Sequence, residues 1–124
     1  MSDPIKRPTI YICGPMTGYP EYNYPEFKRV EERLRDYGYE IENPVVNDTL
    51  LRDLGIGNPG WDDYMRASIA QVLKADGLCC LEGWQWSPGA RLEVEIAMAL
   101  KLPVRWEGQW VEIELRRARE AGEL

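Results

Sequence analysis

Short apolar runs alternate with amphipathic stretches along this chain. The runs Thr9–Cys13 and 77–81 are continuously apolar or β-branched, which is typical of strands buried in a parallel sheet. Between and after them, apolar residues recur every three to four positions, which predicts helices. The predicted helix faces are Phe27, Val30, Leu34 and Tyr37 in the first helix, and Trp61, Met65, Ile69 and Val72 in the second.

Turn residues mark where these elements begin and end. Pro25 suits the first turn of the first helix, and Gly38 suits its C-terminal cap. Further strands are predicted at 39–42 and 103–106, and further helices at 89–101 and 109–123. Residues 45–60 have no clean period and are predicted to be a loop with at most one helical turn.

The alternation of strands and helices predicts an α/β fold for a single domain spanning residues 1–124. We expect a parallel sheet of four or five strands with helices on both faces. Ligands of such sheets bind at the carboxyl ends of the strands. The loops at 14–23 and 82–88 follow two of the strands and are therefore the expected ligand-binding loops.

Composition excludes several classes of function. Lysine and arginine number 15 against 21 aspartate and glutamate residues, giving a net charge of −6, which argues against a nucleic-acid polymer as partner. There is no histidine, so histidine-dependent triads and histidine-ligated metals are excluded. The apolar runs are too short to span a bilayer, and we expect a cytoplasmic protein without membrane contact, metal or cofactor. The cysteines Cys13, Cys79 and Cys80 are predicted to be buried free thiols.

Two glutamates of the helix predicted at 89–101 differ in their neighbours. Glu95 follows Arg91 by four residues, on the polar side of the helix. Glu93 is surrounded at helical spacing by small or apolar residues, namely Gly89, Ala90, Ile96, Ala97 and Leu100. A carboxylate on an apolar face is costly unless it is paired or lines a cleft. Glu93 is therefore either the partner of a buried tyrosine or amide, or a reactive carboxylate in a partly dry pocket; we favour the second interpretation.

Other polar residues are weaker candidates. Ser87 is a suitable N-cap for the helix that bears Glu93, whose amino end would attract an anion. Asp62 lies in the first turn of its helix, where the helix dipole explains it, and Ser68 faces inward and needs a hydrogen-bond partner. Asp76 precedes a strand and is equally a turn residue or a pocket acid.

Three motifs in order resemble the nucleoside 2-deoxyribosyltransferase superfamily. The first is the opening strand and loop from Ile10 to Pro15, continuing to Gly18. The second is Asn-Tyr-Pro at 23–25, and the third is Gly-Trp at 83–84 followed by Ser-Pro-Gly-Ala-Arg-Leu-Glu at 87–93. The likeness covers about residues 9–104 and is greatest to small bacterial and phage members.

The resemblance implies a flavodoxin-like or Rossmann-like three-layer sandwich that cleaves an N-glycosidic bond. It implies that Glu93 is the nucleophile of a covalent glycosyl intermediate and that Tyr11 lies beside it. Asp62 and Ser68 are the remaining catalytic candidates, although the superfamily's leaving-group aspartate is replaced here by Ser68. The substrate-binding candidates are Gly14, Pro15, Met16, Thr17, Asp76, Gly83, Trp84, Ser87, Gly89 and Ala90. A homo-oligomer is also implied.

Four functions stay open at this point. The favoured one is hydrolysis of a nucleoside 5′-monophosphate, because Ser87 matches the phosphate-binding members. Base exchange on free nucleosides is the second, because the first loop has Pro15 and Thr17 where the nucleotide hydrolases carry a serine and an arginine. A non-catalytic nucleotide-binding module is the third, and exposed tryptophans would instead suit a partner-binding protein.

Overall fold

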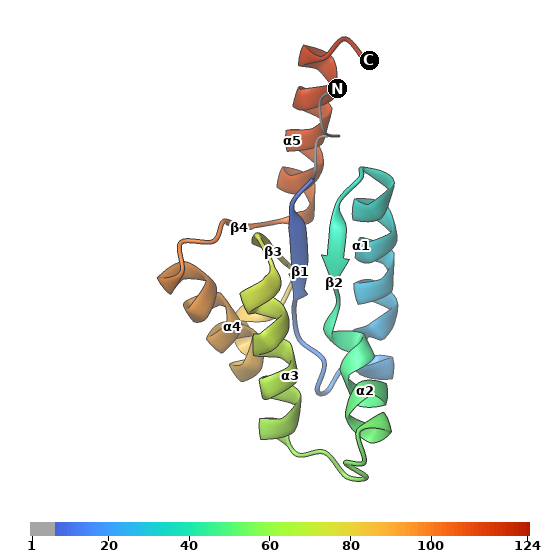
Figure 1. Cartoon of the computed structure of the whole chain (residues 1–124), viewed down its shortest axis with the longest axis vertical. Coiled ribbons are helices and arrows are strands. Elements are labelled where there is room, and N and C mark those ends of the chain that lie inside the picture. The colour runs from blue at the N-terminus through green and yellow to red at the C-terminus, as the bar shows by residue number, and fades with distance from the viewer. Residues whose placement is uncertain (1–6) are drawn as a thin grey trace.

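A four-stranded parallel sheet forms the centre of the computed structural model, which describes residues 7–124 (Figure 1). The strands are β1 (Thr9–Cys13), β2 (Glu40–Glu42), β3 (Gly77–Cys80) and β4 (Val104–Arg105). They lie in the order β2-β1-β3-β4, and each neighbouring pair is parallel. The predicted α/β class and parallel sheet are confirmed, with four strands.

Helices pack on both faces of the sheet. They are α1 (Tyr24–Asp36), α2 (Asn47–Asp53), α3 (Trp61–Lys74), α4 (Pro88–Ala99) and α5 (Glu107–Glu120). Single 3₁₀ turns occur at η2 (Pro44–Val46) and η3 (Trp84–Trp86), whereas η1 (Pro20–Asn23) is a turn whose backbone is left-handed at Glu21 and Tyr22. The caps of α1 agree with the sequence, since Pro25 lies in its first turn and Gly38 beyond its last has a positive φ of 95°.

The prediction for residues 45–60 was wrong about α2. This segment contains a seven-residue helix, where a loop with at most one turn was expected. Only Asn47 and Leu51 of α2 are buried, whereas Leu50 and Leu54 are exposed. The helix therefore lacks the apolar period by which longer helices are recognised.

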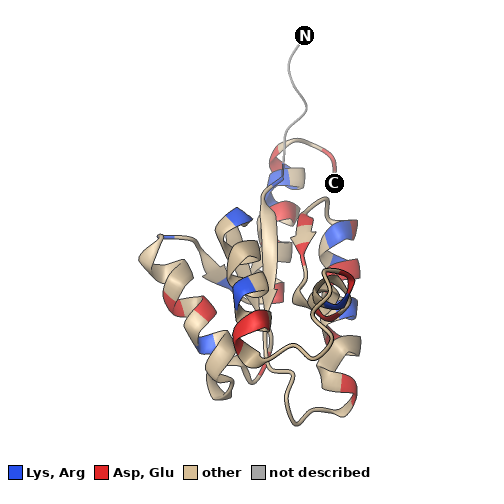
Figure 2. Ribbon diagram, turned by 60° about the horizontal axis from the view of Figure 1, so that its bottom comes forward, with Lys and Arg blue, Asp and Glu red and all other residues tan. Residues whose placement is uncertain are grey.

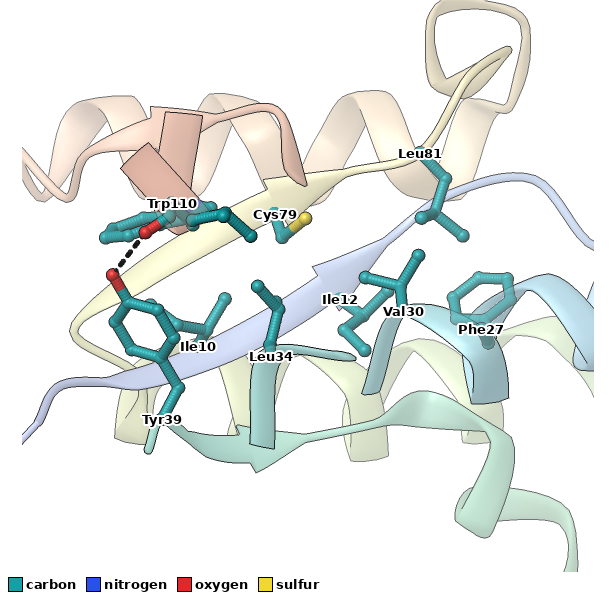
Figure 3. Close-up of a cluster of buried hydrophobic side chains, with 10 residues drawn as sticks. Ile10, Ile12, Phe27, Val30, Leu34, Tyr39, Cys79, Leu81 and Trp110 are labelled. Atoms are coloured by element: carbon teal, nitrogen blue, oxygen red, sulfur yellow. Dashed lines mark hydrogen bonds between the residues drawn. The ribbon is translucent and has the colours of Figure 1, made fainter. Parts of the chain in front are cut away.

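The face of the sheet covered by α1 and α5 is packed with hydrocarbon (Figure 3). Ile10 and Ile12 of β1 pack here against Phe27, Val30 and Leu34 of α1, all of them fully buried. On this face Trp110 of α5 crosses β3 at Gly77, where an added Cβ would lie 2.6 Å from the indole ring. A glycine is therefore needed at that crossing for α5 to approach the sheet.

The opposite face is covered by α3 and α4. Because side chains alternate along a strand, Tyr11 and Cys13 point to this face while Ile10 and Ile12 point away from it. Here they pack with Val72 of α3 and with three residues of α4: Ala90, Val94 and Ala97. Helices on both faces of one sheet make the three-layer sandwich that was expected.

Charged residues of both signs are interleaved on the helices around the uncharged central strand β1 (Figure 2). No helix within residues 7–124 combines the length and the apolar character needed to cross a membrane. The three cysteines are buried and unpaired, as predicted.

Candidate active site

The order of the strands creates a crevice at one edge of the sheet. The chain leaves β1 toward α1 on one face, and it leaves the adjacent β3 toward α4 on the other. The loops that follow β1 and β3 therefore diverge at their carboxyl ends, which is the position where open α/β sheets bind ligands. Gly14 lies where the two loops begin, and its Cβ, if present, would lie 2.8 Å from that of Leu81.

Glu93 lies in α4 facing this crevice end of β1. Its carboxylate is buried and accepts a hydrogen bond of 2.7 Å from the hydroxyl of Tyr11. The thiol of Cys13 lies 3.5 Å from the other carboxylate oxygen and 3.4 Å from the main-chain oxygen of Ala90. The convergence of Tyr11 and Glu93 expected from the sequence is present, whereas Glu95 is exposed.

Burial dominates the electrostatics of this cluster. Loss of hydration raises the pKa of Glu93 to about 7, although the hydrogen bonds from Tyr11 and Cys13 oppose the change. Burial and the neighbouring carboxylate also raise the pKa of the Tyr11 hydroxyl. A hydrogen bond with Cys80, burial and Glu93 raise the pKa of the Cys13 thiol. Near neutral pH both neighbours are therefore protonated donors, and Glu93 is the group that changes charge.

A second buried polar cluster adjoins Tyr11. Ser68 of α3 lies close enough to the Tyr11 hydroxyl to oppose slightly the rise in the pKa of that hydroxyl. The Asn47 amide of α2 donates to Ser68 Oγ at 3.3 Å and to Gln71 Oε1 at 2.8 Å. The sequence identified Ser68 as needing a partner but gave no reason to select Asn47 or Gln71.

An open hollow of about 700 Å³ lies between the two loops. Its lining comprises Tyr19, Asn23, Glu26, Glu82, Gly83, Gln85 and Trp86. Both ligand-binding loops expected from the sequence thus border one hollow. Glu93 does not line it, and its side chain is buried. A smaller hollow of about 340 Å³, next to Tyr37 and Leu115, borders none of the predicted site residues.

The first loop is strained where it borders the hollow. Glu21, Tyr22 and Asn23 have φ values of 53°, 54° and 63°, a left-handed conformation that costs free energy in residues with a side chain. The Asn23 amide donates to the main-chain oxygen of Pro15 at 3.0 Å and so ties the two ends of the loop together. Strain of this kind is concentrated at functional sites.

The second loop contributes a tight glycine and an unpaired indole. Gly83 has a φ of 87°, and an added Cβ would lie 2.6 Å from the Tyr19 hydroxyl. Trp84, next along the chain, packs partly buried on the cluster that includes Tyr11 and Ala90. Its Nε1 is the only buried side-chain nitrogen or oxygen in residues 7–124 without a hydrogen-bond partner. Such a donor is uncommon in a buried position and calls for an explanation.

Ser87 caps α4 as predicted, because its hydroxyl accepts a hydrogen bond of 3.2 Å from the Ala90 amide. At the amino end of α4, where an anion site was expected, the Ala90 amide is therefore already hydrogen-bonded to Ser87. Gly89 packs close to Met65 and Trp61, which brings the first turns of α3 and α4 together.

Four predicted residues lie away from Glu93. Asp76 is at the amino end of β3, where its carboxylate accepts the main-chain amide of Thr9 at 2.8 Å, so it is a turn residue and not a pocket acid. Asp62 is exposed in the first turn of α3, and Thr17 is exposed in the first loop. Met16 packs partly buried against the core under α1 and α5.

Comparison with known families assigns this chain by its sequence. Residues 8–106 match the family described as "Domain of unknown function (DUF4406)". The chain belongs to this family. The matched residues contain all four strands, Tyr11, Glu93 and both loops of the hollow. A search of curated proteins finds no match.

This DUF4406 domain therefore holds a carboxylate, a phenol and a thiol in one buried cluster, and it has a hollow lined in part by aromatic side chains between the two loops. Within residues 7–124, no group of three or more histidine, cysteine, aspartate or glutamate side chains is arranged to hold a metal ion.

Proposed function

We propose that this DUF4406 domain cleaves the N-glycosidic bond of a nucleoside or of its 5′-monophosphate, with Glu93 as nucleophile. The observation that carries the proposal is the buried Glu93 carboxylate held by the Tyr11 hydroxyl at 2.7 Å, at the end of the sheet where α/β folds bind ligands. The resemblance in three motifs to the nucleoside 2-deoxyribosyltransferase superfamily supports it. The nucleoside is the proposed partner.

The chemistry follows that of retaining glycoside hydrolysis. In the first step a Glu93 oxygen bonds to the anomeric carbon, and the carbon–nitrogen bond breaks. The base leaves with the electron pair and takes a proton from water. In the second step water bonds to the anomeric carbon, the bond to Glu93 breaks, and a proton is released. Tyr11 holds the carboxylate in place through both steps, and its hydrogen bond favours the ionised form that attacks.

The aromatic lining of the hollow suits a flat base. Tyr19 and Trp86 border it, and Trp86 is 86% exposed, which leaves an indole face free for stacking. Trp84 follows Gly83 of the lining in the chain, but its buried, unpaired Nε1 is not itself part of the hollow's lining.

Release of the sugar to water from a 5′-monophosphate is the first candidate reaction, on account of Ser87 and the amino end of α4. Base exchange on free nucleosides is the second. It is favoured by the two carboxylates of the hollow, Glu26 and Glu82, which repel a phosphate, and by the engagement of Ser87 with the Ala90 amide. A cytoplasmic location and a homo-oligomeric state stay predictions.

The test incubates the protein with a panel of nucleosides and their 5′-monophosphates, with and without a second free base, and measures released base by chromatography. We expect release that Glu93→Gln lowers by at least about a thousandfold. The matched control is Glu95→Gln, an exposed position two residues along α4, which should keep full activity. Faster release from the 5′-monophosphate identifies the hydrolase, and ribosylation of the added base identifies the transferase. Bound nucleoside without release of base contradicts the proposal and leaves a binding module.

A further inference from the structure

The hollow between the two loops presents aromatic rings and carboxylates, and no positively charged side chain within residues 7–124 lines it. Its aromatic residues are Tyr19 from the first loop and Trp86 from the second, and its carboxylates are Glu26 and Glu82. The remaining polar side chains of the lining are two uncharged amides. The lining therefore offers nothing that would attract an anion, and its charge favours a cation.

The two carboxylates of the hollow differ in how far a positive charge compensates them. Glu26 accepts two hydrogen bonds from the guanidinium of Arg29, at 2.6 and 3.0 Å. Arg29 and Arg33 also pair with Glu107, so these four side chains are neutral as a group. Glu82 is exposed and makes no ion pair within residues 7–124. The uncompensated negative charge of the hollow is therefore that of Glu82.

Each loop also contributes an exposed aromatic side chain to the hollow. Trp86 is 86% exposed and Tyr19 is 42% exposed. The Tyr19 hydroxyl lies against Gly83, where an added Cβ would be 2.6 Å from it, so the first loop reaches across to the second. The face of a tryptophan ring attracts a cation more strongly than any other aromatic side chain does. Open aromatic faces and an unpaired carboxylate in one hollow suit a ligand that is both flat and positively charged.

The groups bonded to Glu93 have no spare proton for a leaving base. Tyr11 has one hydroxyl proton, which it donates to the Glu93 carboxylate at 2.7 Å. The thiol of Cys13 faces the same carboxylate and a main-chain oxygen. Of the two aspartates considered from the sequence, Asp62 is exposed and Asp76 lies at the amino end of β3. A base that already carries a positive charge needs no such proton, because it leaves as a neutral molecule.

We propose that the hollow binds a flat aromatic cation, a ring with a quaternised nitrogen, against the rings of Trp86 and Tyr19 and with Glu82 as its counter-charge. As a statement about the substrate this rests on the proposed function, and it names the class: an N-glycoside whose base is positively charged. A Glu93 oxygen bonds to the anomeric carbon, and the electron pair of the carbon–nitrogen bond passes to the ring nitrogen. Water then bonds to the anomeric carbon, the bond to Glu93 breaks, and one proton is released.

The first experiment measures binding alone, with two rings of the same shape that carry no sugar. They are 1-methylnicotinamide, a cation, and nicotinamide, which is neutral. In calorimetric titrations of the whole chain we expect the cation to bind at least about fivefold more tightly. Trp86→Leu and Glu82→Gln should each reduce this preference, and 1 M salt should remove the part that depends on Glu82. The matched controls are Trp106→Leu and Glu95→Gln, which change exposed residues outside the hollow.

Three results of this experiment would overturn the proposal. They are equal binding of the two rings, no measurable binding of either, and a preference for the cation that survives both Trp86→Leu and Glu82→Gln. Because neither ring is a glycoside, these results do not depend on whether the protein releases base.

The second experiment compares release of base from nicotinamide riboside, whose base is a cation, with release from its dihydro form, whose base is neutral. We expect release from the cation to be at least about tenfold faster, and Glu93→Gln to abolish it. Equal or faster release from the neutral form overturns the substrate class and leaves the proposed function in place. Preferential binding of the cation without release of base from any nucleoside contradicts the proposed function and leaves the hollow as a cation-binding site.

Discussion

The two faces of the sheet bury different kinds of side chain. Under α1 and α5 the buried residues are mainly hydrocarbon, and the buried polar atoms are satisfied in place, as in the bond from the Tyr39 hydroxyl to the main-chain oxygen of Trp110 (Figure 3). Under α2, α3 and α4 the buried set includes a carboxylate, a phenol, a thiol, a hydroxyl and two amides. They are Glu93, Tyr11, Cys13, Ser68, Asn47 and Gln71.

Both kinds of side chain come from the same strand. Ile10 and Ile12 of β1 face one side, and Tyr11 and Cys13 face the other. A strand buried on both faces usually needs apolar residues at every position. Here the departure from that rule is confined to one face and is compensated by hydrogen bonds. One face therefore stabilises the fold through hydrocarbon packing, and the other gives up part of its hydrophobic stabilisation to hold a buried carboxylate.

The largest expected effect tests the hydrocarbon face. Phe27 of α1 is fully buried, so Phe27→Ala should lower the free energy of unfolding by about 3–5 kcal/mol, through lost transfer energy and a cavity. The measurement is urea denaturation followed by circular dichroism. Val30→Ala removes fewer buried carbons from the same helix face and should cost less. In either folded variant the titration of Glu93 should be unchanged, and a shifted titration would contradict the separation of the two faces.

Much of this separation could be predicted from the sequence. The strand at β1 was recognisable from its β-branched and apolar residues, and Glu93 was identified because its helical neighbours are small or apolar. Helix α2 and the burial of Asn47 were not predictable from the sequence. The buried Asn47 amide is satisfied by hydrogen bonds to Ser68 and Gln71, which lie more than 20 residues away along the chain. The left-handed backbone at Glu21 and Tyr22 was equally hidden, since only asparagine or glycine would indicate it.

The next effect tests the polar face through pH. Burial raises the pKa of Glu93 from 4.5 to about 7. A carboxyl group with a raised pKa in the folded state binds protons more tightly there than in the unfolded chain. Its contribution to stability is therefore fully present below about pH 4.5 and is lost as the pH rises through 7. Between pH 5 and pH 8 the wild type should lose about 2–3 kcal/mol of unfolding free energy.

Glu93→Gln is the control for this prediction. Its amide does not ionise and can still accept the Tyr11 hydrogen bond, so its stability should change little over the same interval. The variant should therefore be more stable than the wild type at pH 8, although it is the inactive enzyme in our proposal. Thermal or urea denaturation of both proteins at four or five pH values gives the comparison. Parallel curves for the two proteins would show that Glu93 is not a buried acid.

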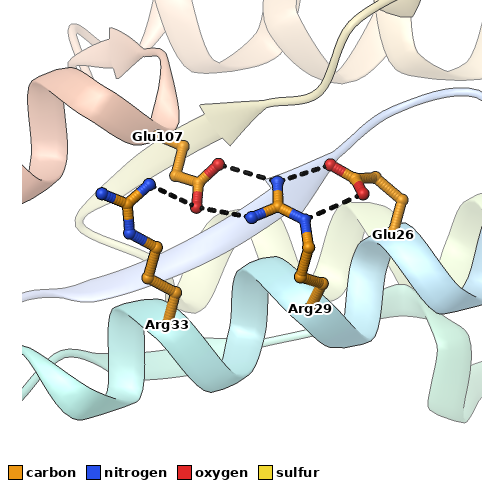
Figure 4. Close-up of polar contacts among 4 residues, drawn as sticks. All are labelled: Glu26, Arg29, Arg33 and Glu107. Carbon is orange, nitrogen blue, oxygen red and sulfur yellow. Dashed lines mark hydrogen bonds and ion pairs between the residues drawn. The ribbon is translucent and has the colours of Figure 1, made fainter.

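The smallest expected effect concerns the ion pairs outside the hydrocarbon core (Figure 4). Glu107, in the first turn of α5, accepts hydrogen bonds from Arg29 at 2.9 and 3.1 Å and from Arg33 at 3.0 Å, and Arg29 also pairs with Glu26. These pairs join α1 to α5 over the same face that Phe27 fills. Partial burial pushes the pKa of Glu107 upward, but the bonds from the two arginines outweigh it, and the pKa is lowered.

Glu107→Gln should nevertheless cost less than about 1 kcal/mol, because the side chains of Arg29 and Arg33 are 52% and 45% exposed and water screens them. The loss should shrink further in 1 M salt. Glu112→Gln is the matched control, since Glu112 is exposed on the same helix and pairs only with Arg119 among the described residues. A double-mutant cycle with Arg33→Gln separates the ion pair from the interaction of Glu107 with the helix dipole. A salt-insensitive loss above about 2 kcal/mol would be as large as the loss from a core defect. It would mean that ion pairs hold α5 to the sheet as much as Trp110 does, and it would contradict the contrast drawn here between the two faces.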